Sequence, residues 1–95
     1  MSNNIVISRD LFIAINNLCT GVESKILFTI IGHEHDSLFT PSSEYMMNMT
    51  GLTQKNHYFV NRKKLMDKGY IQIGADGMRV NMNAILQDYK EEFTC

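Results

Sequence analysis

The feature that most constrains the fold is a tight turn at residues 50–53, Thr-Gly-Leu-Thr, between two segments of helical pattern. Gly51 can take a positive φ and so end the first helix, which is expected over about residues 42–49. A longer helix is expected over about residues 54–68, stopping at Gly69. Two helices joined by a short turn that contains glycine predict a helix-turn-helix over about residues 42–68.

The helical spacing also predicts which side chains of these two helices face the protein interior. They are Tyr45, Met46 and Met49 in the first helix, and Tyr58, Asn61 or Arg62, Leu65 and Met66 in the second.

Two short strands are predicted immediately after the second helix. Alternating apolar residues mark residues 70–73 and 78–82, and the turn Gly-Ala-Asp-Gly at 74–77 joins them into a hairpin. Leu38 and Phe39 form a further candidate strand of two residues. A helix-turn-helix followed at once by a hairpin is the chain order of a winged helix, with a wing over about residues 70–82.

Further helices are expected at both ends of the chain. Ser8 is a candidate cap for the first of them, and Thr20 with Glu23 has the form of a capping box that starts a second, apolar helix ending near Gly32. Asn83 is the candidate cap of a last helix. The apolar stripe of that last helix contains Ile85, Leu86, Tyr89 and Phe93. The predicted fold class is therefore α+β, mainly α, with residues 1–95 forming a single winged-helix domain.

Several runs of this sequence resemble a known family. They are SKIL at residues 24–27, FTPS at 39–42, TGLTQKNHY at 50–58 and RKKLMDKGYI at 62–71. They look like the winged-helix domain of phage and plasmid replication initiators and replisome organisers, especially those of Firmicutes. The resemblance covers roughly residues 22–85 and implies that the helix at 54–68 is a DNA-recognition helix whose groove-facing start lies at residues 54–58.

The charge distribution is compatible with that implication. The formal net charge is only −1, but residues 53–69 contain five basic residues and one acidic residue, a net charge of +4. The rest of the chain has four basic and nine acidic residues, a net charge of −5. A local positive surface of this kind attracts a phosphate backbone, although the same residues are also what an ordinary solvated helix face carries.

Side-chain chemistry then assigns expected roles in DNA binding. Amide and imidazole groups near the start of a recognition helix can reach base edges, lysine and arginine contact phosphates, and the amide end of the helix at 42–49 can hold another phosphate. Arg79, beside the hairpin turn, is expected to reach an adjacent minor groove. The predicted DNA-binding residues are Ser42, Ser43, Thr53, Gln54, Lys55, Asn56, His57, Tyr58, Arg62, Lys63, Lys64 and Arg79.

Other roles remain open for several of these residues. Asn56 and Thr53 are also candidate caps of the second helix. Tyr58 shares a helical stripe with Leu65 and so is also a candidate core aromatic residue. Arg79 is equally compatible with a solvated position on a strand.

No cofactor or metal site is predicted. Residues 33–36, His-Glu-His-Asp, cluster four possible metal ligands but have no partner at a suitable spacing, and the same holds for the two cysteines, Cys19 and Cys95. Motifs typical of an enzyme are not found. Residues 1–4 lack the features of a signal peptide and no apolar run is long enough for a membrane span, so we expect a cytoplasmic protein that does not associate with membranes.

The sequence therefore predicts a double-stranded DNA-binding protein, not an enzyme, in replication or transcription control of a mobile element such as a phage or plasmid. A winged helix used as a protein-interaction adaptor is the alternative, for which the net acidity and the stripe in the last helix are the reasons. The stripe also predicts a homodimer through Ile85, Leu86, Tyr89 and Phe93. A replication protein is a further expected partner.

Overall fold

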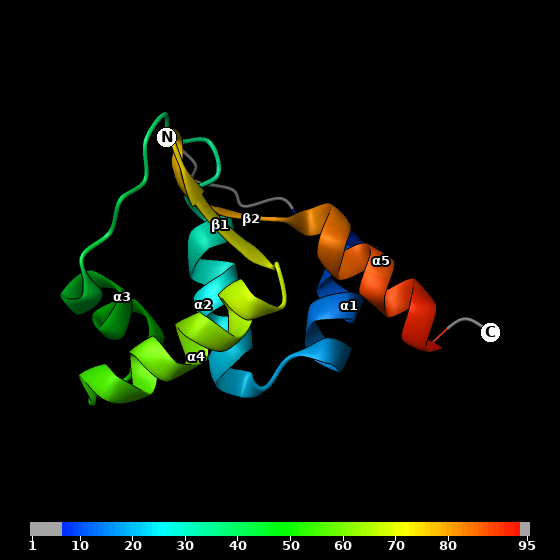
Figure 1. Ribbon diagram of the computed structural model, residues 1–95, viewed down its shortest axis with the longest axis horizontal. Helices are drawn as coiled ribbons and strands as arrows, with labels where there is room; N and C mark the ends of the chain where they lie inside the picture. Colours follow the sequence, from blue (N-terminus) through cyan, green and yellow to red (C-terminus); the bar gives the residue numbers. More distant parts are fainter. Residues whose placement is uncertain (1–6, 94–95) are drawn as a thin grey trace.

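The computed structural model describes residues 7–93, so Cys95 lies outside the described residues. Within that range the chain is mainly helical with one antiparallel hairpin, as expected for the α+β class (Figure 1). The elements in chain order are α1 (Arg9–Leu18), α2 (Gly21–Ile31), α3 (Ser43–Thr50), α4 (Lys55–Asp67), β1 (Ile71–Gly74), β2 (Gly77–Val80) and α5 (Met82–Phe93).

Helix α2 forms the centre of the core. It begins at the predicted capping box, in which the Glu23 amide donates to Thr20 Oγ1 at 3.2 Å and the Thr20 amide donates to Glu23 Oε1 at 2.9 Å. Its apolar side chains Ile26 and Leu27 are fully buried. Because α2 contacts α1, α3, α4 and β2, it holds the rest of the structure in place.

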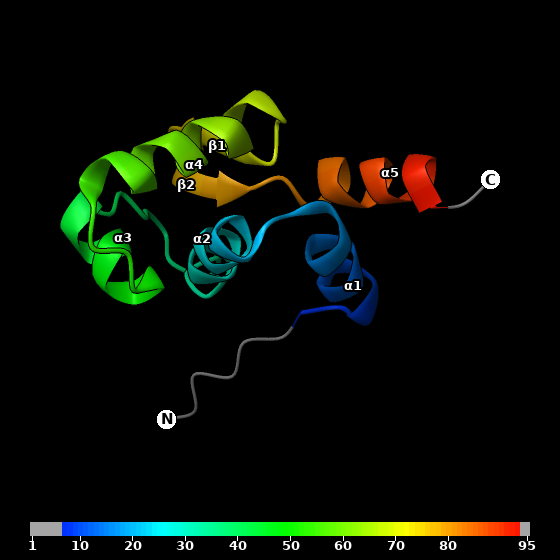
Figure 2. The same cartoon turned by 90° about the horizontal axis from the view of Figure 1, so that it is seen from below.

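Helices α1 and α5 pack side by side at one end of the molecule (Figures 1 and 2). Ser8 caps α1 as predicted, accepting from the Leu11 amide at 3.1 Å. The cap of α5 is not Asn83 but Asn81, whose Oδ1 accepts from the Ala84 amide at 3.2 Å. The predicted helix start was two residues late because the second strand was expected to run to residue 82, whereas β2 ends at Val80.

The position of Ile85 contradicts part of the predicted dimer surface. This side chain is fully buried within the chain, in the same core cluster as Leu11 and Ile15 of α1. The α1–α5 packing therefore covers the inner part of the stripe, and only Phe93 at its end is largely exposed. Ile85 is not available to a second copy of the chain.

A tight turn joins α3 to α4. Gly51 has φ +74°, in the left-handed region, and the Leu52 amide donates to the Met47 carbonyl at 3.0 Å, which closes the end of α3. The cap position of α4 is Gln54, and its side chain makes no capping hydrogen bond. The prediction that Thr53 or Asn56 caps α4 is therefore wrong.

The inner faces of α3 and α4 differ in part from the predicted ones. Met46, Tyr58 and Leu65 are buried, and so is Asn61, whose amide Nδ2 donates to the His57 carbonyl at 2.9 Å. Met49 and Met66 are exposed instead. Each of these helices is covered along one narrow side only, so an apolar residue slightly off that side meets solvent.

The hairpin aligns Ile71 with Val80 and Gly74 with Gly77. Phe39 forms an isolated parallel bridge to Gly77, and the Met78 amide donates to the Phe39 carbonyl at 2.7 Å. The candidate strand at residues 38–39 is therefore present as this single bridge. It ties the tip of the hairpin to the segment that leads into α3.

Candidate nucleic-acid interface

The outer face of α4 collects most of the predicted base-reading and phosphate-binding residues. Tyr58, Asn61 and Leu65 hold one side of the helix in the core. The rest of the helix surface faces solvent: Asn56 and Lys63 lie opposite the buried side, Lys55 lies on one flank, and His57 and Lys64 lie on the other, all of them exposed. The predicted recognition helix therefore presents Asn56 and Lys63 outward and one further lysine on each flank.

The lysines of α4 differ in their partners. Lys55 Nζ lies 3.6 Å from Glu44 Oε1, and Lys63 Nζ lies 3.2 Å from Asp67 Oδ2. Both pairs are exposed, so each contributes little to stability and can exchange its carboxylate for another anion at low cost. Lys64 makes no ion pair within residues 7–93. A polyanion therefore meets three accessible ammonium groups along α4.

Two of the predicted site residues have structural roles. Tyr58 is buried, and Ser42 caps a helix. Tyr58 is a core residue, and burial is the main cause that raises the pKa of its hydroxyl. The prediction that it faces a groove is therefore wrong, for the packing reason that its stripe with Leu65 suggested. Ser42 Oγ accepts from the Tyr45 amide at 3.1 Å, so this hydroxyl caps α3.

The remaining predicted residues of α3, α4 and the turn between them are exposed to different degrees. Thr53 and Gln54 are exposed, and Ser43 is half-buried with its hydroxyl donating to Glu44 Oε2 at 3.4 Å. Arg62 is half-buried, and its guanidinium lies over the Phe59 ring, 5.9 Å from the ring centroid. Arg62 Nε is buried without a hydrogen-bond partner among the described residues.

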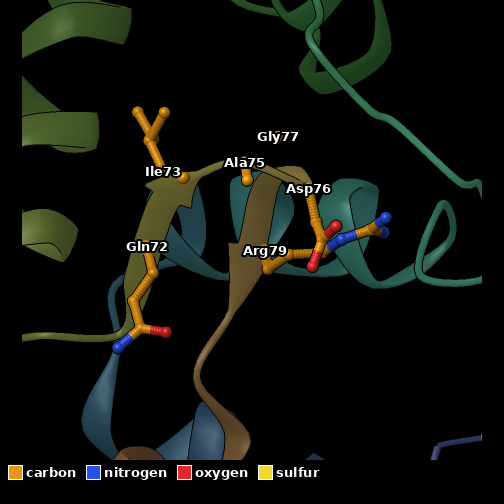
Figure 3. Close-up of a pocket in the computed structure, with 7 residues that line it drawn as sticks. Gln72, Ile73, Ala75, Asp76, Gly77 and Arg79 are labelled. Atoms are coloured by element: carbon orange, nitrogen blue, oxygen red, sulfur yellow. The ribbon is translucent and has the colours of Figure 1, made fainter.

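Arg79 does not reach outward from the hairpin. Its guanidinium Nη1 donates to the carbonyls of His33 at 3.0 Å and Glu34 at 3.2 Å, and Nη2 donates to the carbonyl of Asp36. Figure 3 shows this side chain leaving β2 on the side away from Gln72 and Ile73. The expectation of a minor-groove contact is therefore corrected, because three carbonyls of the loop at residues 33–36 hold the guanidinium.

The loop at residues 33–36 contains the four possible metal ligands, and the side chain of His33 is hydrogen-bonded within the protein. His33 Nδ1 donates to Asp36 Oδ2 at 2.8 Å, and His33 Nε2 shares a hydrogen bond of 2.7 Å with the Tyr45 hydroxyl. The ring also stacks on Phe39 with centroids 4.2 Å apart. Nδ1 thus closes the loop on itself and Nε2 joins the loop to α3. Residues 7–93 contain no group of three or more potential metal-binding side chains.

The sequence analysis did not anticipate two exposed apolar side chains on α4, Phe59 and Val60, and it expected Met66 to face the interior. Phe59, Val60 and Met66 are 40%, 44% and 40% exposed. The helical spacing carried the signal, since Val60 lies opposite Tyr58 and Leu65, and Phe59 lies about a quarter turn from Tyr58.

A hollow of about 550 Å³ lies beside the hairpin turn (Figure 3). It is lined by Gln72, Ile73, Gly74, Ala75, Asp76, Gly77 and Arg79. This lining has no nucleophile paired with a base.

None of the helices in residues 7–93 is both long and apolar enough to span a bilayer. Comparison with known proteins found no family model, no curated protein and no solved structure that matches this chain.

Proposed function

We propose that this chain is a winged-helix protein that binds double-stranded DNA, with α4 in the major groove, and acts in replication or transcription control of a mobile element. The order α3, turn, α4 and hairpin supports the fold, as does the bridge between Phe39 and Gly77, which adds a third segment to the hairpin. The family resemblance of residues 22–85 supports the pathway. The role is binding, without catalysis.

The observation that carries the proposal is the outer face of α4. It is held rigidly by three buried side chains and presents Lys55, Lys63 and Lys64 with Asn56 and His57 at its start. Amides at the start of such a helix pair with adenine, while the lysines contact phosphates and set the position of the helix. Helices α1 and α5 lie away from this face (Figures 1 and 2), so their carboxylates do not cover it, and Glu44 and Asp67 are the acidic residues paired with its lysines.

The test begins with selection of bound fragments from a random duplex library, followed by titration of the selected duplex at several salt concentrations. We expect affinity to fall steeply with salt. Lys55→Glu with Lys63→Glu should lower the slope of log Kd against log salt by about 2, one for each lost phosphate contact. The control is Arg9→Glu, which makes the same change in charge per substituted residue on exposed α1 residue Arg9, and it should leave the slope nearly unchanged. Unchanged binding in the double lysine variant rejects the assignment of α4.

The exposed apolar residues of α4 favour a second candidate, a winged helix that docks on another protein. Phe59, Val60 and Met66 lie on the surface that would face DNA, and apolar side chains are typical of the centre of a protein interface. An adaptor would retain its partner at high salt and would not shift duplex DNA. The salt titration therefore separates the two candidates.

A further inference from the structure

The apolar pair Phe59 and Val60 occupies a defined place on α4. Both residues follow Asn56 by one helical turn, at i+3 and i+4, and precede Lys63 by one turn, so the four side chains are neighbours on the helix surface. About two-fifths of each apolar side chain is exposed. Along the outer face of α4, the amide of Asn56 is therefore followed by two apolar side chains and then by the ammonium group of Lys63.

Phe59 is held in place by its own neighbours. Its ring centroid lies 5.2 Å from that of buried Tyr58, and the Arg62 guanidinium lies over it. A side chain fixed in this way loses little conformational freedom when a ligand covers it. The exposed part of the Phe59 ring therefore needs little rearrangement to contact a ligand.

We propose that Phe59 and Val60 contact the C5-methyl groups of thymine, so that α4 selects duplexes rich in A·T base pairs. This inference rests on the proposed function. In the major groove the thymine methyl is the apolar feature of the base edges, whereas adenine presents N6 and N7, which suit an amide. In this arrangement Asn56 contacts adenine, and Phe59 and Val60 contact thymine, the two bases of an A·T pair.

The surroundings of the pair favour DNA over a protein partner as the occupant. Lys55, Lys63 and Lys64 flank the two apolar residues on the same helix. Ammonium groups on both sides of a small apolar patch complement a groove bordered by phosphates. Asp67, the acidic residue of α4, lies at the far end of the helix and is paired with Lys63.

The experiment compares duplexes that differ only in the methyl group. Alternating dA-dT and dA-dU duplexes of about 20 base pairs carry the same charge and the same hydrogen-bonding groups in the major groove. We expect the full chain to bind the dA-dU duplex more weakly, by about fourfold for each methyl group that it buries. Phe59→Ala with Val60→Ala should remove most of this difference while leaving the salt slope unchanged.

Two further variants guard against loss of folding. Val60→Thr keeps the volume and shape of the side chain but replaces one methyl group with a hydroxyl, and it should also reduce the preference for methylated duplex. Phe93→Ala removes a similarly exposed ring from α5 and should keep the full preference. Circular dichroism melting curves verify that each variant is folded.

The outcomes separate this inference from the proposed function. Salt-dependent binding with equal affinity for the two duplexes, or a methyl preference that survives in the Phe59 and Val60 variants, overturns the inference and leaves the DNA-binding role intact. Failure to bind either duplex at low salt overturns both. A methyl preference lost in these variants supports the inference.

Discussion

The ammonium group of Lys68 lies 3.3 Å from Oε2 of Glu23, and this contact joins the end of α4 to the start of α2 across 45 positions of the chain. The Glu23 side chain is buried, and its other oxygen accepts the Thr20 amide in the capping box. The carboxylate of Glu23 therefore takes part in the cap of α2 and also holds the end of α4 against the start of α2.

Removing Lys68 should destabilise the protein more than neutralising Glu23. Lys68→Met leaves a buried carboxylate without its cation, whereas Glu23→Gln keeps an acceptor for Thr20 and leaves an ammonium group that water can solvate. Because Lys68 is partly exposed, we expect a loss of about 1–2 kcal/mol for Lys68→Met, below that of a fully buried pair. Urea denaturation measures both variants, and an equal or larger loss for Glu23→Gln contradicts this role of the pair.

The same carboxylate should make stability depend on acid pH. Burial disfavours its ionised form, but hydrogen bonds from Thr20 and Lys68 outweigh burial and lower the pKa of Glu23 below its ordinary value of 4.5. The unfolded chain then binds the proton more readily, so this stabilisation is fully present above pH 4.5 and is lost as pH falls through the folded pKa.

Free energies of unfolding at neutral pH and near pH 3 test this sign. The stability advantage of the native chain over Glu23→Gln should shrink toward acid pH. An advantage that stays constant or grows shows that the ionised carboxylate is not the stabilising form.

Gly77 should tolerate no side chain. Its φ is +88°, and an added Cβ would lie 2.3 Å from the Phe39 carbonyl oxygen, a backbone atom that cannot turn aside. We expect Gly77→Ala to cost more than about 2 kcal/mol, because strain and the lost bridge act together. Gly74→Ala is the matched control, since nothing lies within 4 Å of its Cβ position. Thermal melts that show equal effects for the two variants contradict the bridge as a structural constraint.

Arg79 should act in stability and not in DNA binding. A lysine at this position cannot reach three loop carbonyls at once, so Arg79→Lys should lower stability by about 1–2 kcal/mol. Duplex affinity and its salt slope, measured where the variant is folded, should stay within about twofold of the native values. A native-like stability together with a slope reduced by about 1 indicates instead that the guanidinium meets DNA.

Much of the secondary structure follows from local sequence. The Thr20–Glu23 box, the Ser8 cap and the Gly51 turn were predicted correctly because each depends on residues three or four apart. For the candidate site, the accessible lysines and amides of α4 also lie on the predicted helix. The helical spacing also predicted that Tyr58 faces the interior, and its burial excludes the groove-facing role that the family resemblance implied for it.

The sequence alone determined the starts of α1 and α2 and the turn at Gly51, since hydrogen bonds between near neighbours decide those points, but it misplaced the caps of α4 and α5. Only the tertiary structure decided which side of each short helix is covered, so that Phe59 and Met66 meet solvent while Leu65 does not. It also decided the partners of Arg79 and Lys68, which are more than 40 residues distant in the chain. Such contacts depend on how complete elements pack together, and no short window of sequence contains both of their members.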